Sequence, residues 1–294
     1  MYITIENETL KAAFNTKGAE MISLILKEDN SEYVWQGNPD IWAKHAPLLF
    51  PVIGRLKDNE YTLRGKAYHI TNHGFGRDSE FEVLSQKDDS VSFLLTPNEL
   101  SAQMYPFPFR LQINYTLSGN TLKKEHIVTN EGGSTLYYEI GGHDGYNICL
   151  EPEEVMEDYY LDFGALDAIH PLRLDENILI LDGTDTIPLK DGKLNLRMEL
   201  FKVDALMLRK PGVDQISLRS RKSGRYITFA FHDFPTIGIW TKYKPFNTNY
   251  ICFEPWSTLP DCAYLGKELE KKVDIRTVEP GEKDVLSFSV TVGK

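Results

Sequence analysis

Short stretches in which apolar and polar residues alternate recur along the whole chain, and they constrain its fold more than any other feature. A period of two is typical of β-strands that bury one face in a core. We predict strands at 2–6, 21–26, 80–86, 91–96, 110–117, 123–130, 215–220, 226–231, 237–243, 250–255 and 285–292. Residues suited to turns separate these stretches, so the chain is expected to be mostly β.

Two pairs of these stretches are predicted to form antiparallel hairpins. The first pair, 80–86 and 91–96, flanks the polar residues Lys87, Asp88, Asp89 and Ser90. The second pair, 110–117 and 121–128, flanks Ser118, Gly119 and Asn120. Residues of these types favour tight reversals of the chain, so neighbouring strands are expected to run antiparallel.

Helical windows are few and short. One lies at 38–46, where Asn38 would cap and Pro39 would start a turn of helix, and another begins at Asn98 and covers 98–105. A parallel α/β fold needs a helix between most strands, and these are missing. The sequence shows no repeat, low-complexity segment or linker that would divide it. We therefore predict a single all-β domain over 1–294, a large antiparallel β-sandwich.

The charge balance excludes some classes of partner. There are 43 acidic and 32 basic residues, a formal net charge of −11, which disfavours binding to nucleic acid and to an anionic membrane surface. No 18-residue apolar run appears, and the first residues lack the features of a signal peptide, so we expect a cytoplasmic protein. The three cysteines lack metal-ligand spacing and form no even set, so neither a metal site nor a disulfide framework is expected.

Glu254 is the most informative polar residue. The motifs of serine hydrolases, zinc proteases and nucleotide-binding proteins are absent, which leaves polar side chains in apolar or glycine-rich surroundings. Glu254 lies between Phe253 and the pair Pro255 and Trp256. Desolvation there would raise its proton affinity toward the range of a general base. The alternative is a buried glutamate paired with an arginine.

Four further polar residues are candidates for the same site. His73 precedes Gly74, whose freedom lets the backbone turn or approach a ligand closely, and His143 follows two glycines at the end of a β-rich stretch. Arg55 follows an apolar run, and Asp204 interrupts one, where a buried acid must find a donor or cost several kcal/mol. Each has a structural alternative: a turn histidine, a surface arginine at a strand exit, or an aspartate that caps a turn.

Other conspicuous residues have simpler interpretations. The acidic segment 151–162 lacks the ligand spacing of a calcium loop and is expected to be a solvated edge or loop. Trp35, Trp42, Trp240 and Trp256 are expected to lie mostly in the core, although sugar sites commonly use an aromatic face.

The order and spacing of the candidate residues resemble those of the aldose 1-epimerase family, most closely its LacX-like branch. The matching segments are 50–61, 72–81, 141–147, 201–208, 251–261 and the closing strand after Pro280 and Gly281. They extend over some 200 residues, so the resemblance covers nearly the whole chain.

The resemblance implies a sandwich with an open cleft that binds a free hexose such as galactose or glucose. By it, Glu254 matches the general base and His143 the general acid that open and reclose the sugar ring and so interconvert its anomers. His73, Arg55 and Asp204 match residues that hold sugar oxygens, with the glycines after His73 letting its loop approach the sugar. It implies a small-molecule sugar partner and chemistry that needs no metal or cofactor. A long edge strand would allow two copies to pair, so either a monomer or a homodimer is expected.

Two features keep alternatives open. Asp144 and Gly145 stand where family members more often have a proline or small residue and an aromatic. In a related branch that acts on hexose 6-phosphates, an arginine placed like Arg77 holds phosphate, and Arg77 with Arg55 would do so here. A non-catalytic carbohydrate-binding protein, or a glycosidase using Glu254 and Asp204, is also compatible with the sequence.

Overall fold

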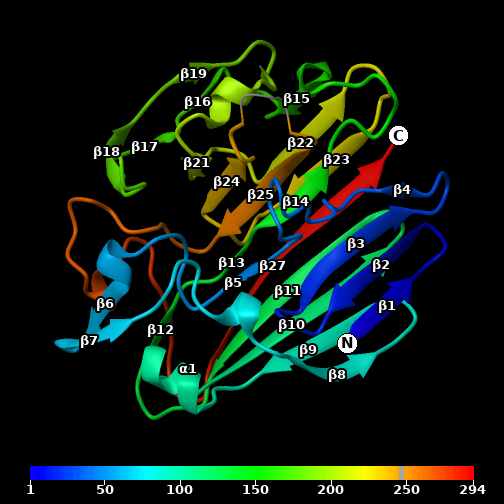
Figure 1. Cartoon of the computed structure of the whole chain (residues 1–294). Helices are drawn as coiled ribbons and strands as arrows, with labels where there is room; N and C mark the ends of the chain where they lie inside the picture. The colour runs from blue at the N-terminus through cyan, green and yellow to red at the C-terminus, as the bar shows by residue number, and fades with distance from the viewer. Residues whose placement is uncertain (245–247) are drawn as a thin grey trace.

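The computed structural model describes residues 1–244 and 248–294. One long antiparallel sheet forms the main layer of the fold (Figure 1). Within the described residues this sheet has nine strands in the order β20-β15-β22-β23-β27-β11-β10-β9-β8. Their bounds are β8 Glu82–Gln86, β9 Ser90–Leu95, β10 Phe109–Ser118, β11 Thr121–Asn130, β15 Tyr159–Asp162, β20 Lys193–Asn195, β22 Gln215–Ser220, β23 Tyr226–Ala230 and β27 Lys283–Gly293.

Two smaller sheets pack on the long one. The first has the order β21-β24-β25-β13-β5, with β14 also paired to β25, and the second has the order β1-β2-β3-β4. Their bounds are β1 Tyr2–Glu6, β2 Leu10–Asn15, β3 Glu20–Leu26, β4 Ser31–Glu32, β5 Leu48–Leu49, β13 Gly141–Gly142, β14 Asp144–Asn147, β21 Leu206–Arg209, β24 Thr236–Trp240 and β25 Tyr250–Trp256. Phe229 of β23 stacks on Phe253 of β25 with ring centres 5.2 Å apart, which joins the long sheet to the β25 sheet.

Short hairpins and helices complete the described part of the chain. The two-stranded pairs are β6 Glu60–Leu63 with β7 Lys66–His69, β12 Leu136–Tyr138 with β26 Arg276–Val278, β16 Ala168–Ile169 with β19 Ile187–Pro188, and β17 Leu172–Leu174 with β18 Ile180–Thr184. The helix is α1 Glu99–Met104, and the 3-10 helices are η1 Lys57–Asn59, η2 Gly76–Asp78, η3 Met156–Asp158, η4 Met198–Phe201 and η5 Leu269–Lys271. This is the sandwich that the strand pattern predicts.

Both predicted hairpins are confirmed, as is the helix after Asn98. β8 pairs with β9, and β10 pairs with β11 through all ten residues of each strand. The Asn98 side chain accepts a hydrogen bond from the Ser101 backbone N–H at 2.9 Å, and the Ser101 hydroxyl accepts one from the Asn98 backbone N–H at 2.9 Å. This reciprocal cap begins α1 where the sequence predicts it.

The helical window at 38–46 is wrong beyond a single turn. The Asn38 side chain accepts from the Asp40 N–H at 3.0 Å, and the Trp42 N–H donates to the Asn38 carbonyl at 2.8 Å, but no helix follows. The Trp42 carbonyl accepts a hydrogen bond from the Trp35 indole at 2.8 Å, so it is turned away from a helical ladder. The strand predicted at 237–243 likewise ends early, at Trp240.

Alternation along the central strands builds the core. In β10 every second residue from Phe109 to Leu117 is buried. Its partner β11 alternates in the same way, yet three of its core-facing residues, Lys124, His126 and Asn130, are polar and almost fully buried. Polar groups in such positions cost free energy unless they are paired.

The acidic segment 151–162 is only partly the solvated loop expected. Glu154 is buried and accepts a hydrogen bond from Ser223 at 2.7 Å, and Glu151 lies 2.6 Å from the guanidinium of Arg225. Several of these carboxylates therefore hold the end of the long sheet together.

Candidate active site

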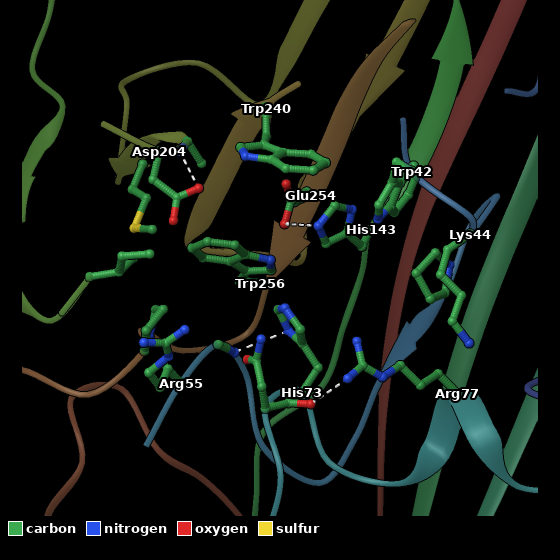
Figure 2. Close-up of a pocket in the computed structure, with 17 residues that line it drawn as sticks. Trp42, Lys44, Arg55, His73, Arg77, His143, Asp204, Trp240, Glu254 and Trp256 are labelled. Atoms are coloured by element: carbon green, nitrogen blue, oxygen red, sulfur yellow. Dashed lines mark hydrogen bonds and ion pairs between the residues drawn. The ribbon is translucent and has the colours of Figure 1, made fainter. Parts of the chain in front are cut away.

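All six residues predicted for a site line one pocket (Figure 2). Its volume is about 270 Å³, just under the ~300 Å³ at which pockets for drug-sized ligands begin. The predicted residues that line it are Arg55, His73, Arg77, His143, Asp204 and Glu254. Residues that are 199 positions apart in sequence thus meet in a space suited to a small ligand.

Glu254 and His143 form the centre of the pocket. Every residue of β25 is buried, and Glu254 is 2% exposed. His143 lies between β13 and β14, where the chain runs antiparallel to β25. Its Nε2 atom is 3.3 Å from Oε2 of Glu254. A carboxyl and an imidazole at this distance can share and exchange a proton.

Burial acts on both members of this pair. It raises the pKa of Glu254 well above its usual range, and the negative charges of Asp204 and Asp144 add to the rise. It lowers the pKa of His143 to about 3; a hydrogen bond within the residue opposes this, and Arg77 adds to the fall. The pair therefore favours a state with one proton on the carboxyl and a neutral imidazole, and it titrates as a unit.

Aromatic rings hold the imidazole in place. Trp42 stacks on His143 with ring centres 5.0 Å apart, and Trp240 meets it edge-on at 5.3 Å. Both tryptophans are only partly buried and line the pocket, as does Trp256. Trp35 and Trp256 are buried as expected, whereas Trp42 and Trp240 are only partly buried at the pocket.

His73 is held as a neutral donor. Its backbone has a φ of +63°, and its Nδ1 accepts a hydrogen bond from the Gly54 N–H at 3.1 Å. Burial lowers the pKa of His73 well below its usual value, and His143 and Arg77 lower it further. The neutral ring therefore carries its proton on Nε2, which is free to donate to a ligand.

The glycines after His73 pack closely on another segment of the chain. A Cβ on Gly74, where φ is +69°, would lie 2.3 Å from the carbonyl oxygen of Phe50. A Cβ on Gly76 would lie 3.1 Å from the Phe50 side chain. The loop thus packs closely on the chain at Phe50, and this contact aims His73 into the pocket.

The charged residues lie on separate sides of His73. Figure 2 shows Arg55 on one side and Arg77 on the other, so they do not form the arginine pair suggested for a phosphate. Arg77 donates to the Asn72 carbonyl at 2.7 Å. Lys44, which the sequence did not single out, lines the same pocket, and Lys44 and Arg77 both contact Asp78, at 3.2 and 3.7 Å.

Asp204 borders the pocket from the segment before β21. Its side chain accepts a hydrogen bond from the N–H of the next residue, Ala205, at 2.9 Å. Burial raises its pKa, while the Ala205 N–H, Trp240 and Arg55 act in the opposite direction. Asp204, Trp240 and Arg55 all line the pocket.

A buried ionic network fixes the segment that carries Arg55. Glu139 accepts a hydrogen bond from the Ile53 N–H at 2.7 Å and lies 3.1 Å from Lys272 Nζ. Asp261 lies 2.7 Å from the same Nζ and accepts from the Lys57 N–H at 2.9 Å. The network thus holds residues 53–57 against the chain that follows β25, and nothing in the local sequence signals it.

Among residues 1–244 and 248–294, no group of three or more His, Cys, Asp or Glu side chains is arranged to hold a metal ion. The same residues contain no helix long and apolar enough to span a membrane. Cys149, Cys252 and Cys262 are free thiols.

The fold and the pocket define an antiparallel β-sandwich protein with a carboxyl–imidazole pair inside an aromatic-walled pocket. Residues 1–276 match the profile of the aldose 1-epimerase family, and the chain belongs to that family.

Individual relatives align with this chain over nearly the full length of both proteins. The plasmid-encoded protein LacX of Lactococcus lactis subsp. lactis is 34% identical over 302 aligned positions, covering 99% of each chain. A galactose mutarotase related enzyme from Lactobacillus acidophilus is 36% identical, with a TM-score of 0.94 over 100% of this chain and 98% of its own. A galactose mutarotase-like protein from Lactobacillus casei is 29% identical, with a TM-score of 0.92 over 100% of both chains.

Proposed function

We propose that the protein is an aldose 1-epimerase that interconverts the α and β anomers of a hexose such as galactose or glucose. The observation that carries this proposal is the buried pair of Glu254 and His143, with 3.3 Å between Oε2 and Nε2, inside a pocket of about 270 Å³. Family membership supports it.

The reaction needs one base and one acid. Glu254 takes the proton of the C1 hydroxyl while His143 donates a proton to the ring oxygen, and the C1–O5 bond breaks to give an open-chain aldehyde. Rotation about the C1–C2 bond presents the other face of the carbonyl, and reclosure reverses both proton transfers. Each group placed in this way contributes about a hundred- to ten-thousand-fold in rate. The pair ends as it began, so the chemistry consumes no cofactor.

The single proton of the pair suits this sequence of steps. Burial favours the proton on Glu254, whereas catalysis starts from a Glu254 carboxylate and a protonated His143. Both states contain the same number of protons, so a transfer over the 3.3 Å separation connects them without exchange with solvent. A sugar hydroxyl that donates to Glu254 would stabilise the carboxylate and favour the reactive state.

The other pocket residues would orient the ring. His73 Nε2–H and Arg55 are donors and Asp204 is an acceptor, a combination that suits sugar hydroxyls. The tryptophan faces provide flat apolar walls for the C–H bonds of the ring. Fixing the sugar in this way lowers the entropic cost of reaching the reactive geometry.

Polarimetry of freshly dissolved α-D-galactose and α-D-glucose at low buffer concentration tests the proposal. The wild type should accelerate the change in rotation, and Glu254→Gln and His143→Asn should each reduce the enzymatic rate about a hundredfold or more. Glu268→Gln, a change at a surface carboxylate paired with Lys271, is the matched control and should leave the rate unaltered. A wild type without effect on either sugar would refute the free-hexose proposal.

A phosphorylated hexose is the second candidate, and Lys44 and Arg77 support it. Both cations line the pocket and share Asp78 as their counter-ion, so a phosphate would displace that carboxylate. Arg77→Met would then raise the KM for glucose 6-phosphate at least tenfold while leaving that for glucose nearly unaltered. Equal effects on both sugars would exclude phosphate recognition by this end of the pocket.

Two further outcomes separate the remaining classes. Sugar binding that is unaffected by Glu254→Gln, without any acceleration of anomer exchange, would favour a non-catalytic carbohydrate-binding protein. Release of the aglycone from a chromogenic glycoside would instead favour a glycosidase.

A further inference from the structure

An ion pair is buried in the core behind the proposed catalytic pair. Lys124 of β11 and Asp144 of β14 are each 1% exposed, and Nζ lies 3.7 Å from Oδ1. The Tyr146 hydroxyl donates to the other carboxylate oxygen at a long 3.4 Å. Neither Lys124 Nζ nor Asp144 Oδ1 has a hydrogen-bond partner. The pair therefore spans the two main sheets in a poorly satisfied polar site.

Its position relative to the pocket follows from the alternation of side chains. His143 points into the pocket, so its neighbour Asp144 points to the opposite face of the sheet, into the core. A Cβ on Gly142 would lie 3.0 Å from Asp144 Oδ1 and 3.1 Å from the Phe288 ring, which places the carboxylate between the sheets. In the register of β14 with β25, Asp144 lies opposite Phe253, the residue before Glu254.

Stability alone does not account for this pair. Replacing a buried ion pair by apolar side chains of similar volume is often neutral or stabilising, because desolvation offsets the attraction of the charges. The missing hydrogen bonds of Lys124 and Asp144 make the offset larger here. What distinguishes the pair is that its acidic member adjoins His143 in the chain and lies opposite Phe253, the residue before Glu254, across the strands.

We propose, on the basis of the proposed function, that the Lys124–Asp144 pair positions the catalytic pair and keeps its shared proton in place to higher pH. The Asp144 carboxylate lies behind Glu254 and His143 and disfavours a second negative charge there. Lys124 comes from the opposite sheet and keeps Asp144 ionised. Asp144 and Lys124 are positioning residues, since they act through Glu254 and His143.

The effects of the surrounding charges agree with a carboxylate at Asp144 and a retained proton on Glu254. Burial raises the pKa of Asp144, and Lys124 and Tyr146 act against that rise by favouring the carboxylate. The ionised Asp144 in turn raises the pKa of Glu254. The other titratable groups that influence these two carboxyls or their immediate partners are Glu20, Tyr115, His126, Asp204, His73, Arg77, Tyr250 and Cys252.

The test is the pH profile of kcat/KM for anomer exchange in the double variant Lys124→Met/Asp144→Asn. Both substitutions approximately keep side-chain volume, and together they leave no unpaired charge in the core. The alkaline limb reports loss of the shared proton and is expected to move to lower pH by about one unit. Superimposable profiles, or an equal loss of rate at every pH, would overturn the proposal.

A second buried cation provides the control. Arg225 is 5% exposed and pairs with Asp29 and Glu151 at the end of the long sheet, away from the pocket residues. Arg225→Met should lower the melting temperature without moving the alkaline limb. A shift in this variant as large as in the double variant would mean that lost stability, not local charge, moves the profile.

A readout without turnover separates this inference from the proposed function. Carboxyl-carbon NMR of ¹³C-labelled protein follows the titration of Glu254, which Glu254→Gln assigns. The Glu254 pKa should fall by about one unit in the double variant whether or not the wild type accelerates anomer exchange. An unaltered Glu254 titration would refute the role of the pair, while absent turnover with a shifted titration would refute only the epimerase proposal.

Discussion

Replacement of Lys272 by methionine tests how strongly the buried ionic network supports the pocket. Lys272 Nζ lies 3.1 Å from Glu139 and 2.7 Å from Asp261, and the three side chains are 6%, 0% and 6% exposed. Removing the cation leaves two buried carboxylates facing each other, a loss of about 3–5 kcal/mol. At about 2 °C per kcal/mol for a domain of this size, the melting temperature should fall by about 6–10 °C.

Calorimetry at several pH values provides the assay. Burial raises the pKa of Glu139 above its unfolded value, and Lys272 opposes that rise. The variant's Glu139 pKa is therefore higher still, and protonation relieves the unpaired charge. The deficit in melting temperature should consequently be small in acid and grow as the pH rises through the raised pKa.

The neighbouring lysine is a matched control. Lys271 pairs with Glu268 at 3.0 Å, but the two side chains are 74% and 44% exposed, so Lys271→Met should leave the melting temperature almost unaltered. Adding Glu139→Gln to Lys272→Met should restore part of the loss. A Lys272→Met protein that melts within about 2 °C of the wild type near neutral pH would refute the reasoning.

Three further predictions concern the site and its support. Gly74→Ala should lower the free energy of unfolding by more than ~2 kcal/mol in chemical denaturation, because its Cβ would lie 2.3 Å from the Phe50 carbonyl oxygen. Gly65 also has a positive φ, +79°, but a Cβ there would meet no atom, so Gly65→Ala should lose only the free energy that the backbone conformation costs. Equal losses of stability in the two variants would contradict the clash at Gly74. The acid limb of the pH profile of kcat/KM should lie far below pH 6.5. Burial lowers the pKa of His143 to about 3, so the Glu254–His143 pair takes up a second proton only near that pH. A limb near 6.5 would mean that His143 is solvated. Trp42→Ala should raise the KM for hexose and lower kcat, because Trp42 both lines the pocket and stacks on His143; kinetics identical to the wild type would assign it to the fold alone.

The sequence by itself determined the class of fold and the most important candidate. Alternation along β10 and β11 and the polar residues between them specify a hairpin, because period and turn chemistry are local properties. The apolar neighbours of Glu254 likewise predict its burial, because they share one strand. Glycine-rich or apolar surroundings made candidates of His143, His73, Arg55 and Asp204, and the family resemblance added Arg77. The structure brings these five together with Glu254 in one pocket.

Only the tertiary structure decided which contacts support these residues and which of them lie apart within the pocket. It separates Arg55 from Arg77, adds Lys44 and Trp42 to the pocket, and turns Gly74 against Phe50. It also joins Lys124 to Asp144 across the core. These contacts link segments that are 20 or more residues apart in sequence, and they depend on strand register and on the packing of one sheet against another. A local pattern shows which face of a strand is buried, but the residue that meets it there comes from a distant segment.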